Sequence, residues 1–184
     1  RAIEEKFEIF WVEEPARRWD YRGLRKVSES VTAAVATGEN LADIKDFTPL
    51  FQHEAIDIAQ IGIGTSGITG LMKVADMAYG YEIPVSLMNS PVNYEAAAAS
   101  AIPNHIMMEI FHDREAGILS TDSTIEDGYL VLGDTPGNGL SIDEAALKKL
   151  PMDSGGNSGS LPPARRRGAG LIEVPISEPD SLDT

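Results

Sequence analysis

Carboxylate and amide side chains follow four short apolar runs of this sequence and are its first candidates for chemistry. Glu13 follows the first run, Glu39 the second and Asn89 the fourth, and Glu109 lies near the end of the fifth. Oxygen ligands without His or Cys suit a hard cation such as Mg²⁺. Carboxylates at the mouth of an apolar barrel are costly unless a cation lies among them. The spacing alone leaves a second interpretation open, in which Glu13 and Glu14 are polar loop residues ahead of Pro15.

The elements that must position these side chains alternate along the chain. Apolar runs of strand length occur at 7–12, 33–37, 56–61, 84–88 and 106–111. Helical patterns lie between or beside them at 21–31, 43–53, 68–79 and 93–101. A strand and a helix repeating every 25 residues or so are typical of parallel α/β architecture. We therefore expect five parallel strands in chain order.

An open doubly wound sheet and a (β/α) barrel both fit this rhythm. The glycine-rich stretch 62–67 lacks the G-x-G-x-x-G order of a dinucleotide-binding turn, so the barrel is preferred. Five strands cannot close an eight-stranded barrel. Because the chain begins at Arg1 rather than Met, we interpret it as a piece of a longer protein.

Charge and composition exclude several classes of function. The sequence has 15 Lys and Arg against 29 Asp and Glu, a net charge of −14, which argues against binding nucleic acid. No apolar run approaches the roughly 18 residues of a membrane span, so no membrane partner is expected. The absence of Cys fits a reducing compartment, and we predict a cytoplasmic protein.

The composition changes near Leu150. Residues 151–184 are rich in Pro, Gly and Ser and show no regular pattern, which predicts a flexible tail after a domain spanning 1–150. A basic run at 165–167 could form a small anion patch, and solvated disorder is the favoured interpretation.

The motifs around the first two carboxylates resemble those of a known family. Trp11-Val12-Glu13-Glu14-Pro15 is followed by Gly38-Glu39-Asn40, with 26 residues from Glu13 to Glu39. Together with the later segments 66–70, 83–84 and 136–140, this order resembles the enolase superfamily of the mandelate racemase and muconate lactonizing enzyme type. The resemblance covers about residues 1–150 and implies the last five strands of an enolase-type (β/α)7β barrel.

The resemblance also implies roles for individual residues. Glu13 and Glu39 match the second and third metal carboxylates, the first of which lies upstream of Arg1. Glu109 matches the carboxyl group that hydrogen-bonds the substrate carboxylate. Asn89 could hydrogen-bond a hydroxyl of a polyol acid, or it could cap the following helix. The family's chemistry is removal of a proton α to a carboxylate, with Mg²⁺ stabilising the charge that develops.

The sequence departs from the family at the catalytic base. The family commonly pairs an Asp on the sixth strand with a His on the seventh, whereas Gly62 and Asn89 stand at these places. His112 is a minor catalytic candidate near Glu109. The basic pair Arg17-Arg18 is interpreted as a solvated loop, with contact to an anionic substrate as the alternative, and Trp19 as loop packing.

Three hypotheses about function follow. The leading one is the C-terminal portion of a Mg²⁺-dependent acid-sugar dehydratase, a lyase that acts on a small carboxylate or acid-sugar substrate. Assembly into a homo-oligomer is left open, and the chain alone is expected to be inactive. The second is a non-catalytic remnant, or pseudoenzyme. The third is an interaction module that pairs its open strand edge with another half-barrel.

Overall fold

A computed structural model describes residues 1–65, 67–88, 93–110 and 118–149. The chain divides into two units, Arg1–Glu144 and Ala145–Thr184, and every described strand lies in the first. The predicted tail from 151, the candidate ligand Asn89 and the minor candidate His112 lie outside the described residues. The boundary proposed near residue 150 therefore stays a prediction.

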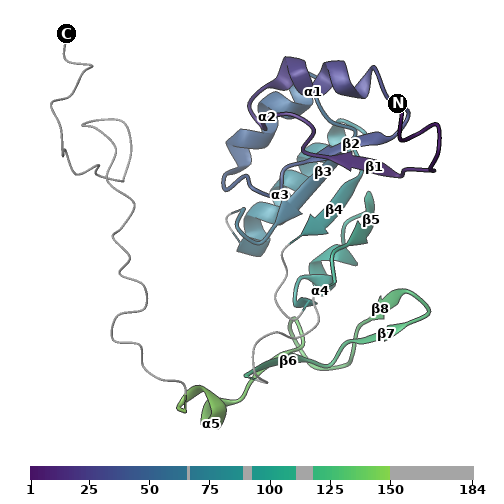
Figure 1. Ribbon diagram of the computed structural model, residues 1–184. Helices are drawn as coiled ribbons and strands as arrows, with labels where there is room; N and C mark the ends of the chain where they lie inside the picture. Colours follow the sequence, from purple (N-terminus) through teal and green to yellow (C-terminus); the bar gives the residue numbers. More distant parts are fainter. Residues whose placement is uncertain (66, 89–92, 111–117, 150–184) are drawn as a thin grey trace, which may run out of the picture. The chain divides into compact units, whose positions relative to one another are not determined.

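A five-stranded parallel sheet forms the centre of the first unit (Figure 1). Its strands are β1 (Trp11–Glu13), β2 (Ala34–Thr37), β3 (Ile58–Gly62), β4 (Val85–Met88) and β5 (His105–Met108). The strands pair in chain order, each parallel to the next. The predicted α/β class and strand order are confirmed.

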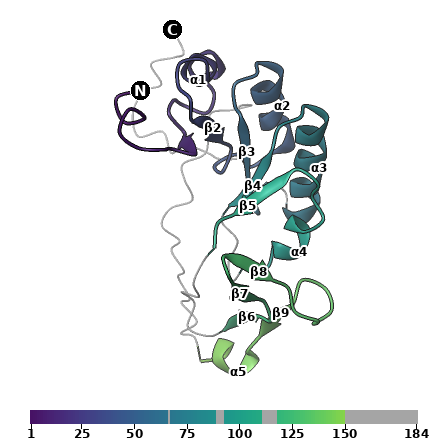
Figure 2. The same ribbon diagram turned by 90° about the vertical axis from the view of Figure 1, so that its right-hand side faces the viewer.

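Helices follow each of the first four strands: α1 (Tyr21–Ser28), α2 (Ile44–Gln52), α3 (Gly67–Gly80) and α4 (Ala96–Ala99). Asp20 and Asp43 cap α1 and α2 by accepting hydrogen bonds from the amides of Gly23 and Lys45. Helices α2 and α3 pack against each other, and Figure 2 shows them along one face of the sheet.

The two faces of the sheet have different surroundings. Val35, Ile61 and Leu87 belong to a buried apolar cluster with Phe47 of α2 and Leu71 of α3. Because successive strand residues point to opposite faces, their neighbours occupy the other side of the sheet. That second face, which we call the open face, carries Glu13 opposite Ala36, then Ile58, Gln60, Ser86 and Met88.

Two details of the predicted elements are wrong. The first strand begins at Trp11 rather than at residue 7, and Phe7 and Phe10 are about two-thirds exposed. β1 is an edge strand of this sheet, so its preceding residues have no second neighbour to extend against. The alanine-rich helix spans only Ala96–Ala99 instead of 93–101. Asn93 has a φ of 58°, whereas a right-handed helix requires a negative φ, so the helix cannot begin there.

Small antiparallel strand pairs follow β5, and the apolar pattern of the sequence does not predict them. Strands β6 (Leu119–Thr121) and β9 (Leu140–Ile142) pair with each other, and β7 (Thr124–Glu126) pairs with β8 (Tyr129–Val131). A short helix, α5 (Glu144–Leu147), follows. The sequence does contain a signal for the second pair, because Asp-Gly is a common two-residue hairpin turn. Asp127-Gly128 joins β7 to β8 with the positive φ angles of such a turn, 50° and 83°.

Candidate active site

Glu13 is the last residue of β1 and lies on the open face of the sheet. It is in register with Ala36, whereas its neighbour Val12 packs against the apolar cluster on the opposite face. The side chain of Glu13 is exposed. A carboxylate therefore stands at the carboxyl end of the first strand, on the side away from the helices.

Glu14 has a different environment from Glu13. Its backbone has a φ of 41°, and its amide donates to the carbonyl of Ala36 over 3.0 Å. Its Oε1 accepts hydrogen bonds from the Thr37 hydroxyl and the Asn40 amide, each at 3.4 Å. Glu14 thus links the end of β1 to the end of β2. Spacing alone could not separate this bracing role from the role of Glu13, and it did not reveal Thr37 or Asn40.

Glu39 follows β2 in a tight turn. The amide of Leu41 donates to the Gly38 carbonyl over 2.9 Å, which places Glu39 inside the turn with a half-buried side chain. Gly38 has a φ of 131°, and a Cβ there would lie 2.7 Å from the Phe47 ring and overlap the Gln60 carbonyl oxygen. Only glycine fits this position, so Gly38 fixes where Glu39 leaves the sheet.

Glu109 continues β5 by one residue, since its amide donates to the carbonyl of Leu87 over 2.8 Å. Glu13, Glu39 and Glu109 therefore all lie at the carboxyl edge of the sheet: Glu13 is the last residue of β1, and Glu39 follows the adjacent strand β2. In the part of the chain that the structure describes, no three acidic, His or Cys side chains form a group that could hold a metal.

The open face also buries polar groups. Gln60 and Ser86 are fully buried there, and the Gln60 amide nitrogen contacts the Met88 sulfur at 3.8 Å. The Oε1 atom of Gln60 has no hydrogen-bond partner among the described residues. Gly62 ends β3 without a side chain, so this strand brings no base to the edge. A buried acceptor usually has a hydrogen-bond donor. We therefore expect the Oε1 atom of Gln60 to accept from a water molecule or from a group outside the described residues.

Glu95 is a buried carboxylate that the sequence analysis missed. It precedes α4 as its N-cap residue, and its side chain is fully buried. Burial raises its pKa to about 7, because removal from water disfavours the charged form. The only sequence signal was one acid next to an alanine run, a context that gives no indication of burial.

His53 and His105 lie at the amino ends of the strands, opposite the edge that carries the glutamates. His53 caps the end of α2 and stacks on Tyr21 at a centroid distance of 5.4 Å. His105 is the first residue of β5, and burial lowers its pKa. Neither lies at the carboxyl ends of the strands.

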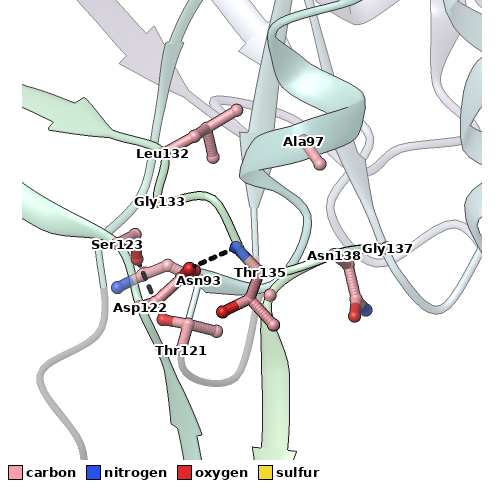
Figure 3. A pocket seen from close by; sticks show the side chains of 11 residues that line it. Asn93, Ala97, Thr121, Asp122, Ser123, Leu132, Gly133, Thr135, Gly137 and Asn138 are labelled. Carbon is pink, nitrogen blue, oxygen red and sulfur yellow. Dashed lines mark hydrogen bonds between the residues drawn. The ribbon is translucent and has the colours of Figure 1, made fainter.

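Asp122, which joins β6 to β7, is one of the residues that line a small cavity of about 50 Å³ (Figure 3). The Asp122 Oδ2 atom accepts a hydrogen bond from the amide of Thr135 over 2.8 Å, and hydrogen bonds from Thr135 lower the Asp122 pKa. Gly133 and Gly139 flank the carboxylate, and a Cβ at either would overlap it. Asp122 therefore holds the glycine-rich 133–139 segment in place, a structural role.

A model of the family described as enolase C-terminal domain-like matches residues 1–146. The chain belongs to the enolase superfamily. The parallel order of β1–β5 agrees with that assignment. No helix in the described ranges is long and apolar enough to cross a membrane.

The chain is similar to several sugar-acid enzymes and mandelate racemase-type structures. It is 30% identical over 153 residues to a D-xylonate dehydratase of Haloferax volcanii, covering 78% of this chain and 37% of that protein. It is 31% identical over 160 residues to the D-galactonate dehydratase family member ManD of Chromohalobacter salexigens, covering 81% and 39%. A mandelate racemase/muconate lactonizing enzyme structure from Sulfitobacter matches with a TM-score of 0.67 at 30% identity, covering 74% and 36%. The chain spans about two fifths of the length of the curated relatives it matches.

Proposed function

We propose that this chain is the C-terminal barrel portion of a Mg²⁺-dependent acid-sugar dehydratase. The observation that carries the proposal is the placement of Glu13 and Glu39 at the carboxyl ends of the adjacent parallel strands β1 and β2. Support for the substrate class comes from relatives named for D-xylonate, D-galactonate and D-mannonate.

The donor set at this edge fits a magnesium ion in part. Glu13 and Glu39 offer carboxylate oxygens, the ligands that Mg²⁺ prefers, and they would hold the ion. Two carboxylates supply too few of the six oxygens of an octahedral site, so we expect weak binding by the chain alone. When bound, the ion would supply positive charge that stabilises a carboxylate substrate as its α-proton leaves.

The remaining residues would bind and orient the substrate. Glu109, beyond β5, would hydrogen-bond the substrate carboxylate, and Asn89 would hydrogen-bond a hydroxyl. Gly62 has no ionisable side chain, so the end of β3 does not provide the base that removes the α-proton. Dehydration requires that proton and the hydroxyl on the next carbon to leave together as water. The base is therefore expected from outside the described chain.

The second candidate function is a non-catalytic half-barrel. The observation that favours it is Gly62 at the end of β3, where the family commonly carries an acid. A chain without metal affinity at Glu13 and Glu39 would support this candidate against the dehydratase.

Calorimetric titration of Mg²⁺ into the 184-residue chain tests the proposal. We expect a weak binding heat for the wild type and its loss in Glu39→Gln. Glu82→Gln is the matched control, because it removes an equal charge from an exposed side chain ahead of β4, at the opposite edge of the sheet. Equal heats for the wild type and Glu39→Gln would remove Glu39 from the site and the dehydratase proposal with it.

A further inference from the structure

Two adjacent arginines near the candidate active site are not neutralised by acidic neighbours. Among the described residues, neither Arg17 nor Arg18 forms an ion pair, although the chain carries a net charge of −14. By contrast, Arg25 of α1 pairs with both Glu29 and Glu54. These two arginines therefore form a small basic site on a protein that is acidic overall.

Both guanidinium groups lie against the ring of Trp19. The Cζ atom of Arg17 is 5.9 Å from the ring centroid and that of Arg18 is 5.3 Å from it. Trp19 is 58% exposed, so it is not the loop-packing residue that the sequence suggested. Cation–π contact restrains the guanidinium planes, and their N–H donors remain available for a planar anion.

The loop that carries these residues forms a hydrogen-bonded turn that is tied to the start of α1. The amide of Asp20 donates to the Arg17 carbonyl over 2.7 Å and closes a turn around Arg18 and Trp19. The Asp20 side chain in turn accepts from the Gly23 amide over 2.9 Å and caps α1. The cluster is therefore presented from a defined turn, which lowers the entropy cost of binding a ligand.

The turn follows β1, so it leaves the sheet at the same edge as Glu13 and Glu39. A sugar acid approaching this edge meets an overall negative protein, and a fixed dicationic site offsets that repulsion locally. The exposed part of the indole offers an apolar surface for the carbon chain of such a ligand.

We propose that Arg17, Arg18 and Trp19 form a binding element for the carboxylate of a sugar acid. The identity of the ligand rests on the proposed dehydratase function; the element itself rests on the two unpaired guanidinium groups stacked on an exposed ring. The element binds the carboxylate through guanidinium donors and acts independently of the metal carboxylates and of Glu109.

Calorimetry on the full 184-residue chain without Mg²⁺ and at low salt tests this proposal. The ligands are D-gluconate, its neutral counterpart sorbitol and inorganic phosphate. We expect gluconate to bind at least about tenfold more tightly than sorbitol, with affinity falling as salt rises, because guanidinium–carboxylate contacts are charge-assisted and screened by ions.

The decisive variant is the double substitution Arg17→Gln and Arg18→Gln. Its matched control is Arg22→Gln with Lys26→Gln, which removes the same charge from exposed positions one turn apart on α1. The first variant should lose about tenfold or more in gluconate affinity and the control less than about twofold. Trp19→Phe, which keeps both charges, should lose an intermediate amount.

Three results would overturn the proposal. They are no gluconate binding by the wild type, equal losses in the double variant and its control, and phosphate binding as tight as gluconate. The last result would indicate a general anion patch without preference for sugar acids. Because Mg²⁺ is absent, failure here is distinguishable from failure of the proposed function, which the Glu39→Gln titration reports separately.

Discussion

At the scale of single residues, the two neighbouring glutamates of the Glu13-Glu14-Pro15 motif divide two tasks. Glu13 faces the open side of the sheet, whereas Glu14 accepts hydrogen bonds from Thr37 and Asn40. The positive φ of Glu14 makes this division possible, because it turns the second side chain toward β2 as the strand ends. A pattern of two adjacent acids cannot reveal which one braces and which one is available, since the answer depends on a backbone angle.

Glu95 makes the free energy of unfolding depend on pH. Its pKa is raised from 4.5 to about 7 by burial, so the folded state binds the proton more tightly than the unfolded state. The stabilisation is complete below about pH 4.5 and is lost as the pH rises to about 7, on the order of 3 kcal/mol in total. We expect Glu95→Gln to remove this loss.

Urea denaturation of the wild type and of Glu95→Gln, at about pH 5 and about pH 7.5, measures the effect. The free energy of unfolding of the variant should fall less between these pH values than that of the wild type. Glu8→Gln, at an exposed position, is the control and should follow the wild type. Parallel pH profiles for Glu95→Gln and the wild type would contradict the prediction.

Gly38 gives the second prediction at this scale. Gly38→Ala should lower the free energy of unfolding by about 3 kcal/mol, because the added Cβ meets the Gln60 backbone and the Phe47 ring at a strained φ. Gly80→Ala is the control: Gly80 ends α3 and has open space around its Cα, so its effect should be small. Thermal melts of both variants test the prediction: the melting temperature of Gly38→Ala should be clearly lower than that of Gly80→Ala. Similar melting temperatures would show that the loop at Gly38 can shift to accommodate the added Cβ.

At the scale of elements, Asp57 joins the sheet to α1. Its Oδ2 accepts from the amide of Val35 over 2.7 Å and its Oδ1 from the Ser28 hydroxyl over 3.0 Å. Asp57→Ala leaves the Val35 amide in a buried strand without that acceptor and should cost about 2 kcal/mol. Denaturant unfolding against Asp76→Ala, an exposed position on α3, measures the difference. Equal stabilities would show that water replaces the carboxylate.

The elements themselves were largely predictable from the sequence. Apolar runs separated by helical patterns led to β2, β3 and β4 within about two residues, because those strands are buried on both faces and carry a continuous apolar signal. The antiparallel pairs β6–β9 and β7–β8 were missed, since strands of three exposed or half-buried residues lack that signal. Burial at Glu95 depends on tertiary contacts, which a local pattern does not encode. The stacking of Arg17 and Arg18 on Trp19 depends on the backbone turn from Arg17 to Asp20, which the residue types alone do not specify.

At the scale of the whole molecule, the net charge of −14 sets the response of stability to salt. Repulsion among excess carboxylates destabilises the compact state, and added salt screens it over distances beyond the Debye length of about 10 Å at 0.1 M. The same salt weakens ion pairs such as Arg25–Glu29 and Lys45–Asp43, but these pairs join exposed side chains and contribute little to stability. Repulsion should therefore outweigh attraction, and the melting temperature should rise between about 0.02 and 0.5 M NaCl. Sucrose at matched osmolality is the control, because it is excluded from the protein surface but does not screen charge. A melting temperature that falls with NaCl would show that the local ion pairs control stability instead.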